Sequence, residues 1–150
     1  MRDPVATPPA LIIMIEDDFG HARLIARNMQ RAGVTAEIRH FLSGSEALTY
    51  LLGRATAGQL DSKRPILILL DLNLGDMAGI DLLARVKNDA SLRRTPVIVL
   101  TTTDDEIEIR RCYDLGANLY VTKPVAYEGF ANTIRQLGQF LPLLRVPLPA

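Results

Sequence analysis

The sequence predicts an α/β protein built on a doubly wound, five-stranded parallel sheet. Short apolar runs rich in Val, Ile and Leu alternate along the chain with amphipathic helical patterns, and this alternation repeats five times. Such apolar runs are typical of strands that are buried on both faces. Because crossovers between parallel strands are right-handed, the simplest topology is the flavodoxin-like strand order 2-1-3-4-5.

The predicted strands are short, and four of them are followed by polar residues. They lie at residues 11–15, 35–40, 66–70, 97–100 and 119–122. Glu16 follows the first strand, Asp71 the third, Thr101 the fourth and Lys123 the fifth. Ligands of open α/β sheets bind outside the carboxyl ends of the strands. We therefore expect acids, a hydroxyl and a lysine to converge on one sheet edge, in a small site for a hard cation and a phosphoryl group.

Helix start and stop signals support the five predicted helices, at residues 18–32, 43–52, 79–87, 104–115 and 128–141. Asp18 and Ser43 are preferred N-cap residues, and Glu46 completes a capping-box pattern. Gly33 and Gly116 follow the first and fourth helices, where glycine commonly ends a helix. The apolar face of the fifth helix has helical spacing and consists of Phe130, Ile134, Leu137 and Leu141.

Composition narrows the class of protein. A chain of 150 residues is expected to form one domain, and its 17 basic and 17 acidic residues give no basic footprint for nucleic acid. No apolar stretch reaches the roughly 18 residues of a membrane span, and the first residues lack the pattern of a signal peptide. Cys112 is the only cysteine, which indicates a reducing compartment. We expect a cytoplasmic protein that binds neither membrane nor nucleic acid.

The strand ends resemble those of the response-regulator receiver domain of two-component signalling, over residues 11–141. The motifs are IED at 15–17, LDLNL at 70–74, LTT at 100–102 and YVTKP at 120–124. The spacings from Asp71 to Thr101 and from Thr101 to Lys123 also suit that family. Each motif is weak alone, but the four occur in the family's order.

The resemblance implies a Mg²⁺ cofactor beside a phosphoacceptor aspartate. Asp71 matches the residue that takes a phosphoryl group from a phosphohistidine of a sensor histidine kinase. Glu16 and Asp17 match the acidic pair that helps to bind the metal, with Asp17 as the direct ligand and Glu16 acting more often through water. Asn73 matches the position whose backbone carbonyl completes the set of protein ligands. Asp18 is interpreted as a helix cap instead of a ligand.

The resemblance also implies a switch. Lys123 and Thr101 would contact the phosphoryl group, and Pro124 is expected to follow a cis peptide bond. Tyr120 matches the aromatic residue that turns inward after phosphorylation. The face formed by the fourth helix, the fifth strand and the fifth helix would then change shape and alter protein contacts.

The sequence departs from the family beside the phosphoacceptor. Gly75 and Asp76 stand where the family often has a proline, and this could alter phosphoryl lifetime or metal affinity. The polar loop at 53–64 is longer than in compact receivers. Together with GHARL at 20–24 and GANLYVTKPV at 116–125, it resembles single-domain regulators that accompany phytochrome-type photoreceptor kinases. Other hybrid kinases use similar partners.

The two ends lie outside the predicted domain, as a tail at residues 1–10 and an apolar, proline-rich segment at 142–150. Because prolines interrupt the second segment, it cannot form one helix. It either folds back over its own core or forms the arm of a homodimer, which the narrower resemblance favours. No room remains for a DNA-binding output domain after Leu141, so we expect output through protein contact or onward transfer to a phosphotransfer domain in a phosphorelay.

Two other functions compete with the phosphorylated switch. A phosphate-independent interaction module would be indicated by a missing acid or lysine, and none is missing. An aspartyl-phosphate phosphatase would want a second aspartate at the position of Asn73. We therefore expect no enzyme beyond catalysis of the protein's own phosphorylation and dephosphorylation. His21 and His40 are interpreted as surface or helix-face residues without a catalytic role.

Overall fold

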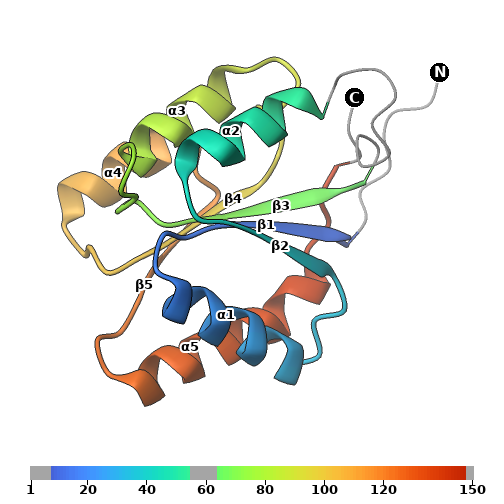
Figure 1. Cartoon of the computed structure of the whole chain (residues 1–150), viewed down its shortest axis with the longest axis vertical. Coiled ribbons are helices and arrows are strands. Elements are labelled where there is room, and N and C mark those ends of the chain that lie inside the picture. The colour runs from blue at the N-terminus through green and yellow to red at the C-terminus, as the bar shows by residue number, and fades with distance from the viewer. Residues whose placement is uncertain (1–7, 55–63, 148–150) are drawn as a thin grey trace.

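The computed structural model describes residues 8–54 and 64–147, which form a parallel sheet between two layers of helices (Figure 1). All neighbouring strands pair in parallel, in the order β2-β1-β3-β4-β5. This arrangement confirms the predicted fold class and strand order. The strands are β1 (Leu11–Ile15), β2 (Glu37–Phe41), β3 (Ile66–Leu70), β4 (Val97–Thr101) and β5 (Leu119–Thr122).

Two helices cover one face of the sheet and three cover the other (Figure 1). The pair is α1 (Phe19–Arg31) and α5 (Tyr127–Phe140), and the three are α2 (Gly44–Gly53), α3 (Gly79–Asn88) and α4 (Glu106–Asp114). The expected caps are present, since Asp18 accepts the His21 backbone N–H at 3.0 Å and Ser43 accepts that of Glu46 at 3.2 Å. Within the described residues, no helix is long and apolar enough to cross a membrane.

β1, β3 and β5 have the predicted boundaries, and the boundaries of the other predicted helices and strands differ by at most two residues. β2 begins at Glu37, because its pairing with β1 begins there, opposite Leu11. As an edge strand it has only one neighbour, so its sequence carries a weaker signal than the central strands do. α4 begins at Glu106 because Asp105 caps it and accepts the Ile107 N–H at 3.2 Å. Of the predicted loop at 53–64, residues 55–63 lie outside the described part of the chain.

The core lies on both faces of the sheet, which explains the uninterrupted apolar strands. Successive side chains of a strand point to opposite faces. Ile13 and Ile15 of β1 pack in the cluster under α2 and α3, whereas Ile12 and Met14 pack in the cluster under α1 and α5. All four are at most 2% exposed. The two buried faces fix the sheet's register and hold the loops at its carboxyl edge in place.

The chain after α5 turns back onto its own core. A short 3₁₀ helix, η2 (Leu141–Leu143), follows α5, and Leu141 and Val146 are each 1% exposed. Leu144 packs against the same cluster as α1 and α5. Leu143 remains on the surface. Residues 148–150 of the predicted C-terminal segment lie outside the described part of the chain.

Candidate functional site

The carboxyl ends of four strands bring buried polar residues together, as the sequence pattern predicts. Glu16 follows β1, Asp71 follows β3, Thr101 ends β4 and Lys123 follows β5. None of these four is more than 7% exposed, which is unusual for charged residues. Asp17, next to Glu16, is exposed. The cluster is therefore a built polar site at the sheet edge, open to solvent beside Asp17.

Lys123 lies at the centre of this site. Its ammonium group donates to Asp71 Oδ2 at 2.9 Å and to Glu16 Oε1, and a third contact, at 3.4 Å, reaches His21 Nδ1. The backbone N–H of Lys123 donates to the Thr101 carbonyl at 2.7 Å. This bond ties the residue to the end of β4. The side chain of Lys123 is thus held between two carboxylates from other strands.

Three carboxylates at this edge could hold a cation. Glu16, Asp17 and Asp71 each offer an oxygen, and these oxygens lie within 4.8 Å of one another. Glu16 Oε2 is buried and has no hydrogen-bond partner among the described residues. A buried carboxylate oxygen without a donor is costly unless something binds it. A set made only of oxygen atoms suits a hard cation such as Mg²⁺, so the residues present fit such an ion.

The pKa values of the two buried carboxyls, those of Glu16 and Asp71, are shifted in opposite directions by their surroundings. Burial raises the pKa of Glu16 to about 8, and the neighbouring Asp71 carboxyl adds to the rise. Burial acts on the pKa of Asp71 in the same direction, but the neighbouring Glu16 carboxyl and the hydrogen bond from Lys123 outweigh it and hold that pKa below its ordinary value. Neighbouring like charges separate pKa values in this way.

Asn73 joins the loop after β3 to the end of β4. Its backbone N–H donates to Asp71 Oδ1 at 3.1 Å, and its side-chain amide donates to Thr101 Oγ1 at 3.4 Å. The start of α3 packs closely here, because a Cβ on Gly79 would lie 2.5 Å from the Asp71 carbonyl oxygen. Only glycine allows this approach. These contacts fix the backbone around Asp71.

The departure at Gly75 and Asp76 has a structural role. Asp76 Oδ1 accepts the Gly44 N–H and Oδ2 accepts the Ser45 N–H, both at 2.9 Å. Its carboxylate therefore binds the N-terminus of α2, where N–H groups lack helical partners. Gly75 is the residue beside the carboxylates, since a Cβ there would lie 3.7 Å from Asp17 Oδ2. The added acid is thus engaged by α2.

Tyr120 links β5 to the loop between β4 and α4. Its hydroxyl donates to the Thr103 carbonyl at 2.5 Å, and its backbone N–H donates to the hydroxyl of Tyr113 at 3.1 Å. Burial raises the pKa of Tyr120 to about 12. The ring packs against the core cluster under α2 and α3. The loop that follows Thr101 is therefore attached directly to the residue expected to switch.

The predicted cis peptide bond before Pro124 is wrong for this structure. None of the peptide bonds described is cis. The trans form of a bond before proline is favoured by roughly 0.5–1 kcal/mol unless the surroundings impose the cis form. Here the trans bond already lets Lys123 reach Asp71 at 2.9 Å, so nothing at the site demands the cis form.

His21 lies on the surface of α1, as predicted, with its side chain 42% exposed, but it also contacts the site. It lies in the first turn of α1, and its imidazole Nδ1 is 3.5 Å from Glu16 Oε1 as well as 3.4 Å from Lys123 Nζ. Helical side chains lean toward the N-terminus of their helix. A residue three positions after the Asp18 cap therefore points back to the carboxyl edge of the sheet, and this geometry was the available signal.

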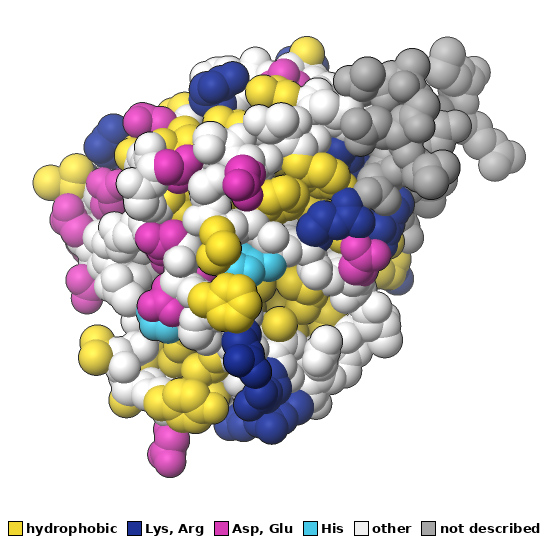
Figure 2. All heavy atoms as spheres, viewed as in Figure 1, with side chains coloured by type: hydrophobic (Ala, Val, Ile, Leu, Met, Phe, Trp, Pro, Cys, Tyr) yellow, Lys and Arg dark blue, Asp and Glu magenta, His cyan; other side chains and the backbone are white. Residues whose placement is uncertain are grey.

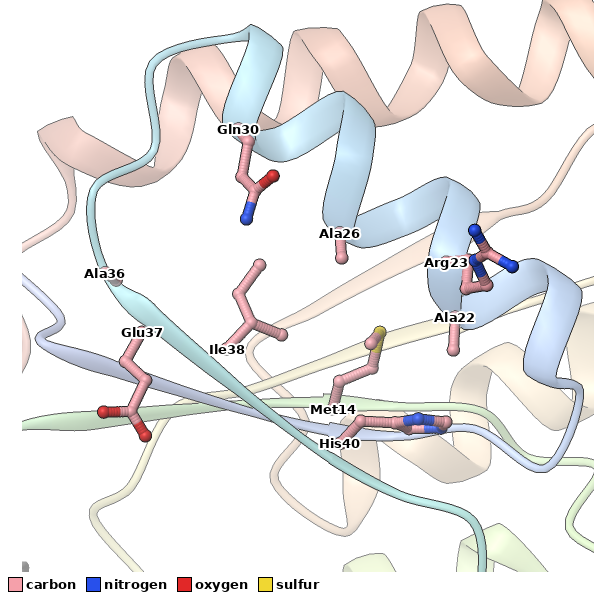
Figure 3. Close-up of a pocket in the computed structure, with 9 residues that line it drawn as sticks. All are labelled: Met14, Ala22, Arg23, Ala26, Gln30, Ala36, Glu37, Ile38 and His40. Atoms are coloured by element: carbon pink, nitrogen blue, oxygen red, sulfur yellow. The ribbon is translucent and has the colours of Figure 1, made fainter.

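A separate hollow of about 400 Å³ lies between α1 and β2 (Figure 3). His40, which borders it, is 2.7 Å through Nε2 from the Glu16 carbonyl oxygen. No carboxylate of the Glu16, Asp17 and Asp71 cluster lines the hollow, so it is distinct from the site. Its floor is apolar and its rim polar, with the lining residues Met14, Ala22, Arg23, Ala26, Gln30, Ala36, Glu37, Ile38 and His40.

Charge on the surrounding surface is uneven. Figure 2 shows most acidic side chains of the visible face on its left, the side where the strands have their carboxyl ends in Figure 1. Basic side chains are prominent in the lower middle and at the right. A negative surface around a carboxylate cluster favours the approach of cations.

Comparison with known proteins shows that the chain is similar to receiver domains and response regulators along most of its length. A solved receiver-domain structure from Rhodospirillum rubrum is 58% identical and has a TM-score of 0.86, with 93% of this chain and 98% of that chain covered. Response regulator Rcp1 of Synechocystis is 32% identical over 97% of both chains. Its Mn²⁺-bound structure has a TM-score of 0.82, 31% identity and coverage of 93% and 99%. The phosphorylated cyanobacterial phytochrome response regulator RcpA is 34% identical with a TM-score of 0.78, covering 89% and 94%.

The match to a family is equally extensive. Residues 12–135 match the response regulator receiver domain, and this span includes all five strands except Leu11, the first residue of β1, together with the whole polar cluster at the sheet edge. The sequence motifs, strand order and buried carboxylates agree with that assignment. The chain belongs to the response regulator receiver domain family.

Proposed function

We propose that this response regulator accepts a phosphoryl group on Asp71 from a sensor histidine kinase, in a reaction that depends on Mg²⁺. One observation carries the proposal: the Asp71 carboxylate lies 2.9 Å from the Lys123 ammonium, beside a Glu16 oxygen that has no partner. The first contact supplies a positive charge where phosphoryl oxygens would arrive. The second marks a place for a cation.

In the proposed transfer, an Asp71 carboxylate oxygen attacks the phosphorus of a phosphohistidine. The new O–P bond forms an acyl phosphate, the N–P bond breaks, and its electron pair stays on the histidine nitrogen of the kinase. Lys123 and Thr101 would then contact the phosphoryl oxygens. The protein supplies position and charge, which is most of what phosphoryl transfer requires.

Glu16, Asp17 and Asp71 would hold the ion, with the backbone carbonyl of Asn73 as a further ligand and Asp17 as the direct ligand of the acidic pair. When bound, Mg²⁺ offsets the repulsion between a carboxylate nucleophile and an anionic phosphoryl group. Asp71 is already held in place by its bond from the Asn73 N–H. The nucleophile therefore needs little rearrangement.

The output of the proposed switch is a change in the α4–β5–α5 face. A phosphoryl group adds about −1.5 to −2 charges and new acceptor oxygens beside Thr101. Tyr120 is bonded to the Thr103 carbonyl, two residues further along the same loop. A shift of this loop toward the phosphoryl group would break or move that bond. We infer that Tyr120 then moves and alters protein contacts on this face.

The proposed partners are a cytoplasmic sensor kinase, of the phytochrome type, and a downstream protein or phosphotransfer domain. RcpA, a phytochrome response regulator, supports the kinase assignment through its similarity along most of the chain. A cytoplasmic location agrees with the single cysteine, Cys112, which is buried and free. We propose no enzymatic activity beyond the protein's own phosphorylation and dephosphorylation.

A homodimer arm formed by residues 142–150 remains part of the proposal. Phe140, just before this segment, and Leu143, within it, expose apolar side chains. Removing residues 142–150 and measuring mass in solution tests it. A dimer that becomes a monomer supports the arm, whereas a full-length chain that is already monomeric at every concentration contradicts it.

Mg²⁺-dependent modification tests the function. Purified protein is incubated with acetyl phosphate or beryllofluoride, with Mg²⁺ or a chelator, beside Asp71→Asn. Uptake that needs both Mg²⁺ and Asp71 is the expected result, read by intact mass for acetyl phosphate and by spectral change for beryllofluoride. A folded wild-type protein that takes up neither would contradict the proposal and favour the phosphate-independent module.

A further inference from the structure

Lys123 contacts His21, a residue that has no role in the proposed transfer. A lysine ammonium has three N–H donors and no acceptor. In this structure it has three partners: Glu16 Oε1, Asp71 Oδ2 and His21 Nδ1. Each proton therefore has one acceptor. The imidazole of His21 supplies the third.

Two of these three partners have another task during phosphoryl transfer. Asp71 becomes the acyl phosphate, and Glu16 is one of the carboxylates proposed to hold Mg²⁺. His21 has no such task. It is therefore the partner that can stay with Lys123 throughout the reaction.

We propose that His21 is a positioning residue that holds the Lys123 ammonium in place for phosphoryl transfer to Asp71. This inference rests on the proposed function. His21 does not contact Asp71 or an arriving phosphoryl group; it acts through Lys123. A flexible lysine stem is costly to order, and a third contact reduces the freedom that must be lost when the phosphoryl group arrives.

Phe130 supports both members of this pair. The His21 ring meets the Phe130 ring edge to face, with centroids 5.4 Å apart and an interplanar angle of 77°. The Lys123 Nζ lies 5.8 Å from the centroid of the same ring. Phe130 is on α5 and only 4% exposed. A rigid side chain from α5 therefore orients an imidazole from α1 and a lysine after β5 toward each other.

The protonation pattern of His21 follows from its neighbours. A hydrogen bond from Lys123 requires Nδ1 to accept, which places the proton of a neutral ring on Nε2. Nε2 is 3.9 Å from the Asp18 carboxylate, which favours a proton there. The alternative puts the proton on Nδ1 and directs it to Glu16 Oε1, at 3.5 Å. Glu16 Oε1 already accepts from Lys123, so the first arrangement satisfies more groups.

Two substitutions separate a positioning role from a packing role. His21→Leu keeps an apolar side chain against Phe130 but has no acceptor. His21→Asn places an amide oxygen near the position of Nδ1 and restores the acceptor. The rate of phosphorylation by acetyl phosphate is measured over a range of donor concentrations at saturating Mg²⁺, and Mg²⁺ affinity is measured separately by calorimetry.

We expect the maximal rate of His21→Leu to fall about tenfold, because a small misplacement of a charged group is costly in the transition state. The half-saturating donor concentration and the Mg²⁺ affinity should change less than about twofold, since His21 binds neither. His21→Asn should recover most of the rate. A leucine variant as fast as wild type, or an asparagine variant as slow as the leucine variant, would overturn the inference.

The imidazole nitrogen resonances of metal-free wild-type protein give a readout that does not depend on activity. We expect Nδ1 of His21 to be unprotonated and Nε2 to be protonated, at a pH where the ring carries one proton. A proton on Nδ1 would show that His21 donates to Glu16 and would overturn the inference even if His21→Leu fails to fold. A wild-type protein that takes up no phosphoryl group would instead contradict the proposed function itself.

Discussion

The ammonium of Lys123 donates to the carboxylate of Asp71 at 2.9 Å, across 52 positions of the sequence. Both side chains are at least nine-tenths buried, so water screens the pair poorly. β4 separates the two strands that carry them, β3 and β5. The contact therefore exists only because β4 holds the ends of β3 and β5 at a fixed spacing.

Replacing Lys123 should destabilise the metal-free protein and increase its response to Mg²⁺. Lys123→Met leaves Asp71 and Glu16 without their shared cation, and breaking a buried pair costs about 3–5 kcal/mol of unfolding free energy. Mg²⁺ should restore more stability to this variant than to wild type, because the ion replaces the lost charge. Urea unfolding with Mg²⁺ and with a chelator measures both effects.

Lys87→Met is the matched control, because the Lys87 ammonium donates to the Thr95 carbonyl at 2.7 Å and does not contact the carboxylates. It should lose stability without any added response to Mg²⁺. An equal Mg²⁺ response in the two variants would contradict the prediction.

Asp17 and its neighbour Asp18 should differ in their effect on metal binding. Asp17 contributes an oxygen to the carboxylate cluster, whereas Asp18 caps α1 by accepting the His21 N–H. We expect Asp17→Asn to weaken Mg²⁺ affinity by about 10- to 100-fold. Asp18→Asn should change it by less than about threefold, because the lost charge is exposed and screened. Calorimetric titration with Mg²⁺ measures the affinity of each variant. Equal losses of Mg²⁺ affinity in both variants would show that Asp18 is a ligand as well.

Removing the Asp76 carboxylate should lower thermal stability in a pH-dependent way. Asp76→Ala takes two acceptors from the N-terminus of α2, and we expect the melting temperature to fall by about 2–4 °C at neutral pH. Hydrogen bonds from the backbone N–H groups of Gly44, which has the larger effect, and Ser45 hold the pKa of Asp76 below its ordinary value. A lowered pKa means that the stabilisation is complete above the ordinary aspartate pKa and is lost as the pH falls through the folded value.

The difference between wild type and Asp76→Ala should therefore shrink below about pH 4. Asp76→Asn keeps one acceptor but no charge, so its melting temperature should lie between the other two and depend less on pH. Thermal melts followed by circular dichroism from pH 7 to pH 3 give the comparison. A constant difference over this range would show that charge plays no part in the cap.

Removing the hydroxyl of Tyr120 should loosen the loop after β4. Tyr120→Phe leaves the Thr103 carbonyl without its donor, and we expect a loss of about 1 kcal/mol in unfolding free energy. Backbone amides at residues 102–105 should exchange faster, which hydrogen exchange measures. Tyr113→Phe is the control, because its half-exposed hydroxyl contacts the Tyr120 backbone and water can replace it. Equal effects of the two variants on loop exchange would contradict a specific role for the Tyr120 hydroxyl.

The sheet and most of the polar site could be predicted from the amino-acid sequence. β1 and β3 lie where the apolar runs predict, because strands buried on both faces cannot tolerate polar residues and so have sharp ends. β5 also lies where its run predicts, although it is an edge strand and none of its residues is fully buried. The residues directly after those ends must meet at the carboxyl edge of a parallel sheet. That rule is enough to bring Glu16, Asp71 and Lys123 together.

The contacts that side chains make across the fold depend on tertiary packing and could not be predicted from the sequence. The binding of Asp76 to α2 and the contact between His21 and Lys123 join elements that are far apart in sequence. The start of α1 places His21 near the carboxyl edge of the sheet, but no local pattern encodes the partner in either contact, since each depends on how a helix is packed against the sheet. The trans bond before Pro124 likewise could not be predicted from the sequence. Buried strands give apolar runs that can be recognised in the sequence, whereas the partner of a single polar side chain is set by the packing around it.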